Sequence, residues 1–320
     1  MSSQVTFAKF KEAFAFEVGG DRTTGNWSTD RDNLFEYLKK DAVSRFEQAH
    51  RWSFLYIDAA LELVPSYTTG TIAIASGVVT GTGTTFPSWA AQGDLWVDDD
   101  GEMRRYSVAS YSSGTSITLD DTSVNVSSGA TYSLRRHWYN LPSDFAGTLD
   151  RGFAFRRDSV YAGVPLQKVG LADYQAYDRD IGGTTGTPCY FTLQPISATS
   201  GASTTWKVGF TPLPGDTMFL DYRYRIAPAD VGSGQYPAGG AAHSETLLAS
   251  FKYSIALYMQ RNNAEERRLE YVRRLQDSIN ADGHYRPIDY GPRGHANYDF
   301  ALERHRYGSI DDATIFGLSH

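Results

Sequence analysis

The chain has 320 residues, of which 37 are acidic, 30 are basic and one is a cysteine, and its net charge is −7. This length allows two domains or one domain with an insertion, and the mild acidity argues against a surface built to grip nucleic-acid phosphates. A single cysteine, Cys189, excludes an internal disulfide and a cysteine-rich metal site. Because no apolar run reaches membrane-spanning length and the N-terminus lacks a signal-peptide core, we expect a soluble, unprocessed protein with no membrane partner.

Residues 1–66 are predicted to supply the N-terminal helices of a helical core. Phe7, Phe10 and Phe14 share one face of a short helix, and a stronger amphipathic helix opens at Asp30. The segment 61–64 then alternates as a strand does, and a proline closes it.

Between residues 67 and 136 the composition changes to Gly, Ser, Thr, Val and Ile, which indicates a β module. The flanking segments both belong to the main domain, so we interpret this module as an insertion. Five short strands suggest a small barrel or sandwich. They are expected at residues 71–75, 94–97, 103–111, 115–119 and 130–135.

Residues 137–240 are predicted to form a central antiparallel β region. Its clearest strands are expected at residues 188–194, 204–210 and 218–224. The proline-rich turn at 212–216 is predicted to join the last two strands as a hairpin.

Residues 241–282 are predicted to form the C-terminal helices of the core. Apolar residues recur every three or four positions from Leu248 to Tyr258 and again from Leu269 to Ile279. The interruption at 260–264 indicates a hinge, after which Asn263 is expected to cap a second helix. The apolar face should pack on the Asp30 helix. The fold class is therefore α+β, and residues 283–320 are expected to form an extended tail, because their apolar content is too scattered for independent folding.

Motifs for catalysis or ligand binding are weak throughout. The glycines at 81–86 resemble the start of a dinucleotide fingerprint but favour a hairpin, and the acidic run 98–102 lacks the ligand spacing of a calcium loop. The histidines follow no compact metal-site spacing, and no nucleophile elbow or phosphate loop occurs. We therefore predict no catalytic, cofactor-binding or metal-binding residue.

Two stretches are candidate interaction sites. A mixed-charge helix surface is either a set of solvated stabilising pairs or a subunit interface, and the spacing does not decide between them. Its members are Glu265, Glu266, Arg267, Arg268, Glu270, Arg273 and Arg274.

The predicted tail interleaves aromatic and arginine side chains, which are the residues that anchor protein interfaces. Disorder is the simpler interpretation, and we expect instead that the tail folds onto a partner. The predicted partner-binding residues are Tyr285, Arg286, Tyr290, Arg293, Tyr298, Phe300, Arg304, Tyr307, Ile315 and Phe316.

Four stretches together resemble the head-to-tail adaptor (connector) proteins of tailed bacteriophages. Residues 45–56 are similar to an early helix that ends in Trp-x-Phe, and residues 139–145 are similar to a Leu-Pro-x-Asp-Phe turn. Residues 208–214 match a Pro-x-Pro hairpin, and residues 247–282 match the closing helices. The β module is longer than the plainest adaptors need and resembles insertions in other phage virion proteins.

This resemblance implies a non-enzymatic virion protein at the head-to-tail junction, made in the host cytoplasm. It implies a homo-oligomeric ring, expected to be a dodecamer, whose helices surround a channel for double-stranded DNA. The C-terminal tail would dock on the portal protein, and tail or nozzle proteins would bind elsewhere on the ring. Net negative charge suits a lumen through which DNA must slide.

Two other classes of function remain open. The aromatic content and the β module also fit a receptor- or carbohydrate-binding virion protein, or an adaptor whose module anchors tail fibres. A cell-wall hydrolase would need paired carboxylates in a cleft, for which Asp94 and Glu102 are a candidate pair. Carboxylates on β hairpins are ordinarily solvated, which disfavours the enzyme.

Overall fold

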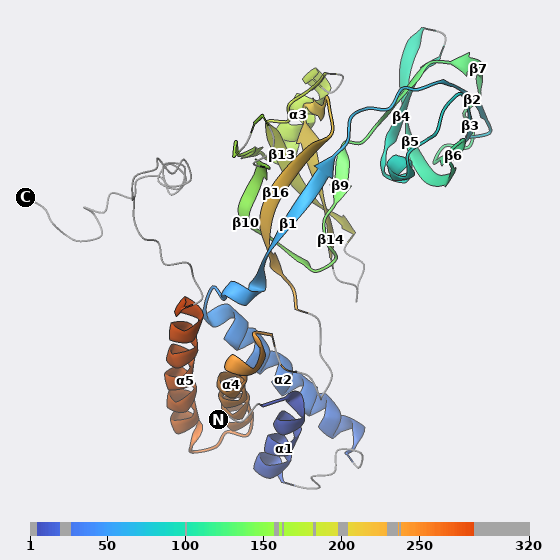
Figure 1. The fold of residues 1–320 in the computed structure, drawn as a ribbon. Helices are drawn as coiled ribbons and strands as arrows, with labels where there is room; N and C mark the ends of the chain where they lie inside the picture. Colours follow the sequence, from blue (N-terminus) through green and yellow to red (C-terminus); the bar gives the residue numbers. More distant parts are fainter. Residues whose placement is uncertain are drawn as a thin grey trace, which may run out of the picture.

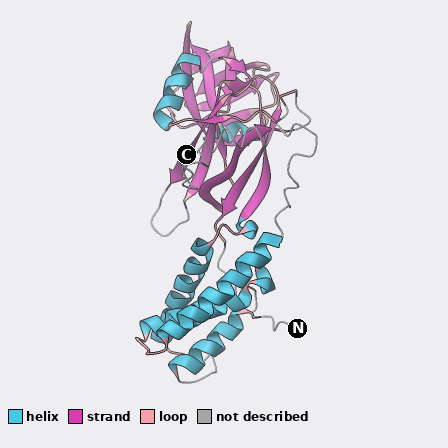
Figure 2. Ribbon diagram, turned by 90° about the vertical axis from the view of Figure 1, so that its left-hand side faces the viewer, coloured by secondary structure: helices cyan, strands magenta, loops and turns pink. Residues whose placement is uncertain are grey.

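The computed structural model describes residues 5–19, 27–99, 101–156, 160–161, 163–181, 184–197, 204–228, 236 and 238–284. This part of the chain is an α+β protein that consists of a helical unit, a central β unit and a β module (Figure 1). The helical unit lies at one end, and the central β unit separates it from the module. Figure 2 shows the same separation of the helical unit from the strands, with a further helix beside the strands. No described helix is both long and apolar enough to span a membrane.

The helical unit is built around α4. Leu247, Phe251 and Ile255 of this helix are all within 1% of complete burial and contact α1 on one side and α2 on the other. Phe10 and Phe14 of α1 pack on Phe251, so the predicted aromatic face of the first helix is confirmed. The bounds are α1 (Phe7–Val18), α2 (Thr29–Ala49), α4 (Ser244–Tyr258) and α5 (Ala264–His284).

The predicted helix, hinge and helix near the C-terminus are confirmed, with two corrections. The hinge contains Gln260 in a left-handed conformation, at φ 50°. Asn263 does not form the predicted cap, because its side-chain oxygen is buried without a hydrogen-bond partner in the described structure. α5 ends at His284 rather than at residue 282, since Gly283 is permissive and does not force a helix to stop.

The α2 helix begins one residue before the predicted start. Ser28 caps it, and the Ser28 hydroxyl oxygen accepts a hydrogen bond from the Arg31 backbone N–H at 3.3 Å. A serine in the extended conformation is a favourable N-cap, because it satisfies one of the backbone donors that a helix start leaves unpaired. Capping therefore favours a start at Thr29 over one at Asp30.

The central β unit is a sandwich of two sheets that share one core. The order is β1-β16-β10 in one sheet and β11-β13-β14-β9 in the other, and Phe153 meets Phe210 between them at 5.2 Å. The bounds are β1 (Tyr56–Leu63), β9 (Trp138–Asn140), β10 (Phe145–Phe155), β11 (Gln167–Lys168), β12 (Thr185–Gly186), β13 (Tyr190–Ser197), β14 (Thr205–Thr211), β15 (Leu213–Pro214), β16 (Met218–Ile226) and the helix α3 (Leu171–Ile181).

The hairpin predicted at 212–216 is wrong. β14 pairs with β13 and β9, whereas β16 pairs with β1 and β10, so the turn carries the chain from one sheet to the other. The reason is that β14 pairs with the preceding strand β13, whereas β16 pairs with β1 and β10 from earlier parts of the chain. β1 follows directly after the N-terminal helices, and it is an edge strand of this unit.

The β module is one antiparallel sheet of seven strands in the order β7-β2-β3-β6-β5-β4-β8. Its two edge strands are separated in sequence only by Thr131, so the sheet curls into a half-barrel around its own core. Five strands were expected, and β3 and β7 are additional. The bounds are β2 (Thr71–Ala75), β3 (Val78–Thr82), β4 (Asp94–Asp99), β5 (Glu102–Ser113), β6 (Ser116–Leu119), β7 (Val126–Ala130) and β8 (Tyr132–Arg135).

Candidate subunit interface on the last helix

The α5 helix lies at the edge of the helical unit, with α4 as its main neighbour (Figure 1). Its inward stripe contains Tyr271, Ser278 and Asp282, each at most 5% exposed. The opposite stripe is open. The seven residues of the predicted interface divide between these two faces.

Arg267 serves contacts within the chain. It binds Glu17 of α1 at 2.7 Å and Glu270 at 3.3 Å. Glu17 is only 10% exposed and also binds Arg261 of the hinge at 2.6 Å. These pairs hold the end of α1 against the start of α5.

Arg274 holds α5 against α4. The Arg274 guanidinium binds Glu245 of α4 at 2.6 Å and Glu270 at 3.4 Å. The Thr246 hydroxyl reinforces this junction, because it lies 2.6 Å from the Ser278 hydroxyl and 3.0 Å from the Arg274 carbonyl oxygen. The contacts of Arg267 with Glu17 and of Arg274 with Glu245 were not predicted. The pairs of Glu270 with both arginines have the spacing of three and four residues that the sequence analysis gave for stabilising pairs within the helix.

The remaining four predicted residues are exposed. Glu265 and Arg268 pair with each other at 2.6 Å, and the hydrogen bond from Arg268 lowers the pKa of the Glu265 carboxyl. An exposed pair of this kind contributes little to folding. In the described part of the chain, Glu266 and Arg273 have no ion pair, and both point outward. They remain candidates for contact with another subunit.

Leu269 and Val272 lie on the same outer stripe, at 56% and 46% exposure. Sequence reasoning placed them on the buried face, because 269, 272, 275 and 279 continue a helical stripe. The structure instead buries the stripe that runs through Tyr271 and Ser278. Both stripes share Leu275, so the spacing alone does not separate them. The packing of α5 against α4 determines which of the two stripes is buried.

The ten residues predicted to bind the portal lie outside the described residues. They are Tyr285, Arg286, Tyr290, Arg293, Tyr298, Phe300, Arg304, Tyr307, Ile315 and Phe316. Their role therefore stays a prediction. In the structure, this segment begins at the end of α5.

The end of α5 is held by a buried carboxylate that sequence reasoning read only as a helix stop. Asp282 is 1% exposed and accepts hydrogen bonds from the Ser53 backbone N–H at 3.1 Å and from the Ser53 hydroxyl at 2.5 Å. His50 Nε2 lies 3.5 Å from the same carboxylate. Ser53 opens the single turn that leads into β1. Asp282 thus joins the last helix to the start of the central β unit.

His243 lies beside this junction, among the rings of Trp52 and Phe54 at 5.2 and 5.3 Å. Burial lowers the pKa of the His243 imidazole from its ordinary value of 6.5, and the Asp282 carboxylate opposes that shift. Between the lowered pKa and 6.5, the unfolded chain binds more protons than the folded chain. Stability should therefore fall as pH drops below about 6.5, until the pH reaches the lowered pKa.

We expect the His243→Gln variant to lose this part of the pH dependence. The measurement is the free energy of unfolding in denaturant between pH 7.5 and 5, compared with the wild-type protein. Asp282→Asn should steepen the wild-type slope, because it removes the charge that stabilises the protonated imidazole. Parallel curves for His243→Gln and wild type would show that His243 does not titrate on unfolding.

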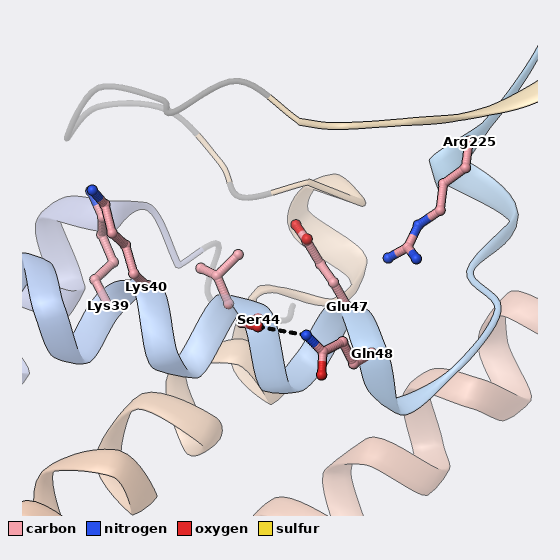
Figure 3. Close-up of a pocket in the computed structure, with 7 residues that line it drawn as sticks. Lys39, Lys40, Ser44, Glu47, Gln48 and Arg225 are labelled. Atoms are coloured by element: carbon pink, nitrogen blue, oxygen red, sulfur yellow. Dashed lines mark hydrogen bonds between the residues drawn. The ribbon is translucent and has the colours of Figure 1, made fainter. Parts of the chain in front are cut away.

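A basic pocket of about 250 Å³ lies on α2, where it meets the end of β16 (Figure 3). Lys39 and Lys40 project from α2, and Arg225 extends from β16 toward Glu47. Burial raises the pKa of the Glu47 carboxyl, and the nearby Arg225 charge opposes the shift. The lining residues are Lys39, Lys40, Val43, Ser44, Glu47, Gln48 and Arg225.

Within the described ranges, no three His, Cys, Asp or Glu side chains gather in a way that would hold a metal ion. Neither a scan against models of known protein families nor a search of curated proteins finds a match to this chain.

Proposed function

We propose that this chain is a structural, non-enzymatic adaptor at the head-to-tail junction of a tailed-phage virion. Copies would form a ring, expected to be a dodecamer, beneath the portal and around the path of the DNA. The observation that carries the proposal is the outer face of α5, where Leu269 and Val272 are exposed on an edge helix. Aliphatic side chains in the middle of an open helical stripe are what a neighbouring subunit covers.

The arrangement of the units supports this proposal. The segment predicted to dock on the portal begins at the end of α5, and Asp282 anchors that end to the rest of the molecule. The β units extend from the same end of the helical unit, because Asp282 at the end of α5 meets Ser53 just before β1 (Figure 1). One chain can therefore contact a neighbour through α5, a portal through its C-terminal segment, and tail or nozzle proteins through its strands.

Cryo-electron microscopy of assembled particles tests the proposal. We expect a ring of this protein between the portal and the tail. A position elsewhere in the particle would contradict the proposed function.

The module supports a second role within the same particle. It has a core of its own and lies at the far end of the molecule from α5, which suits an outward-facing anchor for tail fibres (Figure 1). A glycan-array screen of residues 67–136 separates this role from receptor binding. Specific sugar binding by the module would favour a carbohydrate-binding protein over a fibre anchor.

A further inference from the structure

The helical unit carries two outward-facing helical stripes of different character. The stripe on α5 combines Leu269 and Val272 with the exposed carboxylates of Glu266 and Asp277. Neither carboxylate forms an ion pair within the described residues. The eleven-residue separation of Glu266 and Asp277 corresponds to about 16 Å along the helix. Arg273 is also exposed on this face and lies between them, so the face presents an aliphatic centre with two carboxylates and one guanidinium, a net charge of −1.

The stripe on α2 is basic. Tyr37 is 63% exposed, and Lys40, Ser44 and Gln48 follow it at steps of three and four residues. The pocket lies along this stripe. Lys39 is 8% exposed and pairs with Glu36 at 2.6 Å. Lys40 and Arg225 are therefore the cations that face the single carboxylate of Glu47. Val43 supplies an apolar wall. The pocket can thus take an aliphatic side chain that is flanked by carboxylates.

The two stripes face away from each other on opposite sides of the helical unit. α4 lies between α2 and α5 in Figure 1 and contacts both. On α2, the buried Phe35, Ala42 and Phe46 face α4, and Lys40 and Ser44 lie on the other side of the helix. In the view of Figure 3, Lys39, Lys40 and Glu47 project from the side of α2 that is farther from α5. One copy therefore cannot bring its own two stripes together.

We propose that the outer face of α5 in one copy packs on the basic pocket of α2 in the next copy. This inference rests on the proposed ring and names the surface that receives α5. Contacts between two different faces on opposite sides of a subunit join copies head to tail, and they close into a ring when the rotation allows it. A contact between two α5 helices would instead close as a dimer and leave the pocket uncovered.

Charge reversal on each face tests the contact. Lys40→Glu places a carboxylate opposite Glu266 in every contact, and Glu266→Lys places an ammonium opposite Lys40. We expect each variant alone to associate about tenfold more weakly per contact, and an equimolar mixture to regain wild-type assembly. The mixture restores assembly because alternating copies pair opposite charges at both kinds of contact.

The measurement is native mass spectrometry of each protein, alone and with portal, with melting temperatures to show that every variant folds. Glu102→Lys, an exposed reversal on the β module, is the matched control and should change nothing. Leu269→Glu should prevent assembly both alone and when mixed with a charge-reversal variant, since it removes the aliphatic centre.

The outcomes separate the contact from the ring. If wild-type rings form and Lys40→Glu leaves them intact, the pocket is not the receiving surface, although the ring stands. If Leu269→Glu disrupts assembly and Lys40→Glu does not, α5 has another partner, and the inference fails. If the wild-type protein stays monomeric both alone and with portal, the proposed function fails as well.

Discussion

Deletion of residues 285–320 should abolish binding of this protein to its portal and leave its melting temperature unchanged. Every described core residue precedes the cut, and Asp282, which anchors the end of α5, is retained. The deleted segment is also too sparsely apolar to add a core of its own. Surface plasmon resonance with immobilised portal measures the loss, and a thermal melt checks the fold.

A full-length control separates chain length from side-chain chemistry. In it, the ten predicted anchor residues of the C-terminal segment are replaced by Ser or Gln. If the aromatic and arginine side chains bind the portal, this variant should fail as completely as the deletion. Wild-type binding by the truncated protein would remove the segment from the mechanism.

Asp282→Ala should destabilise the protein by about 3 kcal/mol, one of the largest effects available from a single polar side chain. The buried carboxylate accepts hydrogen bonds from both the backbone N–H and the hydroxyl of Ser53. Its removal leaves both donors without this acceptor in a site that is 1% exposed. It also frees the end of α5 from the start of the central β unit.

Denaturant unfolding followed by circular dichroism measures this loss. Asp277→Ala is the matched control, since Asp277 is exposed on the same helix and should change stability by less than about 0.5 kcal/mol. Asp282→Asn keeps the shape and removes the charge, so it should fall between the two. Equal stability of Asp282→Ala and Asp277→Ala would show that the junction with Ser53 contributes nothing.

Several elements could be predicted because their signals are local. The hinge between α4 and α5 could be predicted because apolar residues recur every three or four positions on both sides of it and the recurrence is interrupted between them. The strands of the module follow from composition and short turns, and β2 occupies the predicted residues 71–75. The error in the module is the number of strands, since β3 and β7 were not predicted. Short strands rich in Gly and Ser carry a weak alternation signal.

The candidate site was predicted only in outline. Periodicity located a charged helix and identified Glu266 and Arg273, which are exposed in the structure. It did not reveal that Arg267 and Arg274 hold α1 and α4. Periodicity also missed the basic pocket, because Arg225 is far from α2 in the sequence and lies next to it only in the tertiary structure.

The sequence by itself determined the helices of the helical unit and five of the seven strands of the module, because hydrophobic spacing and capping act over a few residues. Only the tertiary structure decided which strands share a sheet, which stripe of α5 is buried, and that Asp282 meets Ser53 across 229 positions of the chain. These outcomes depend on contacts between distant segments, where several pairings satisfy the same local pattern. Packing against α4 settles the choice for α5, and it leaves Leu269 and Val272 open to solvent.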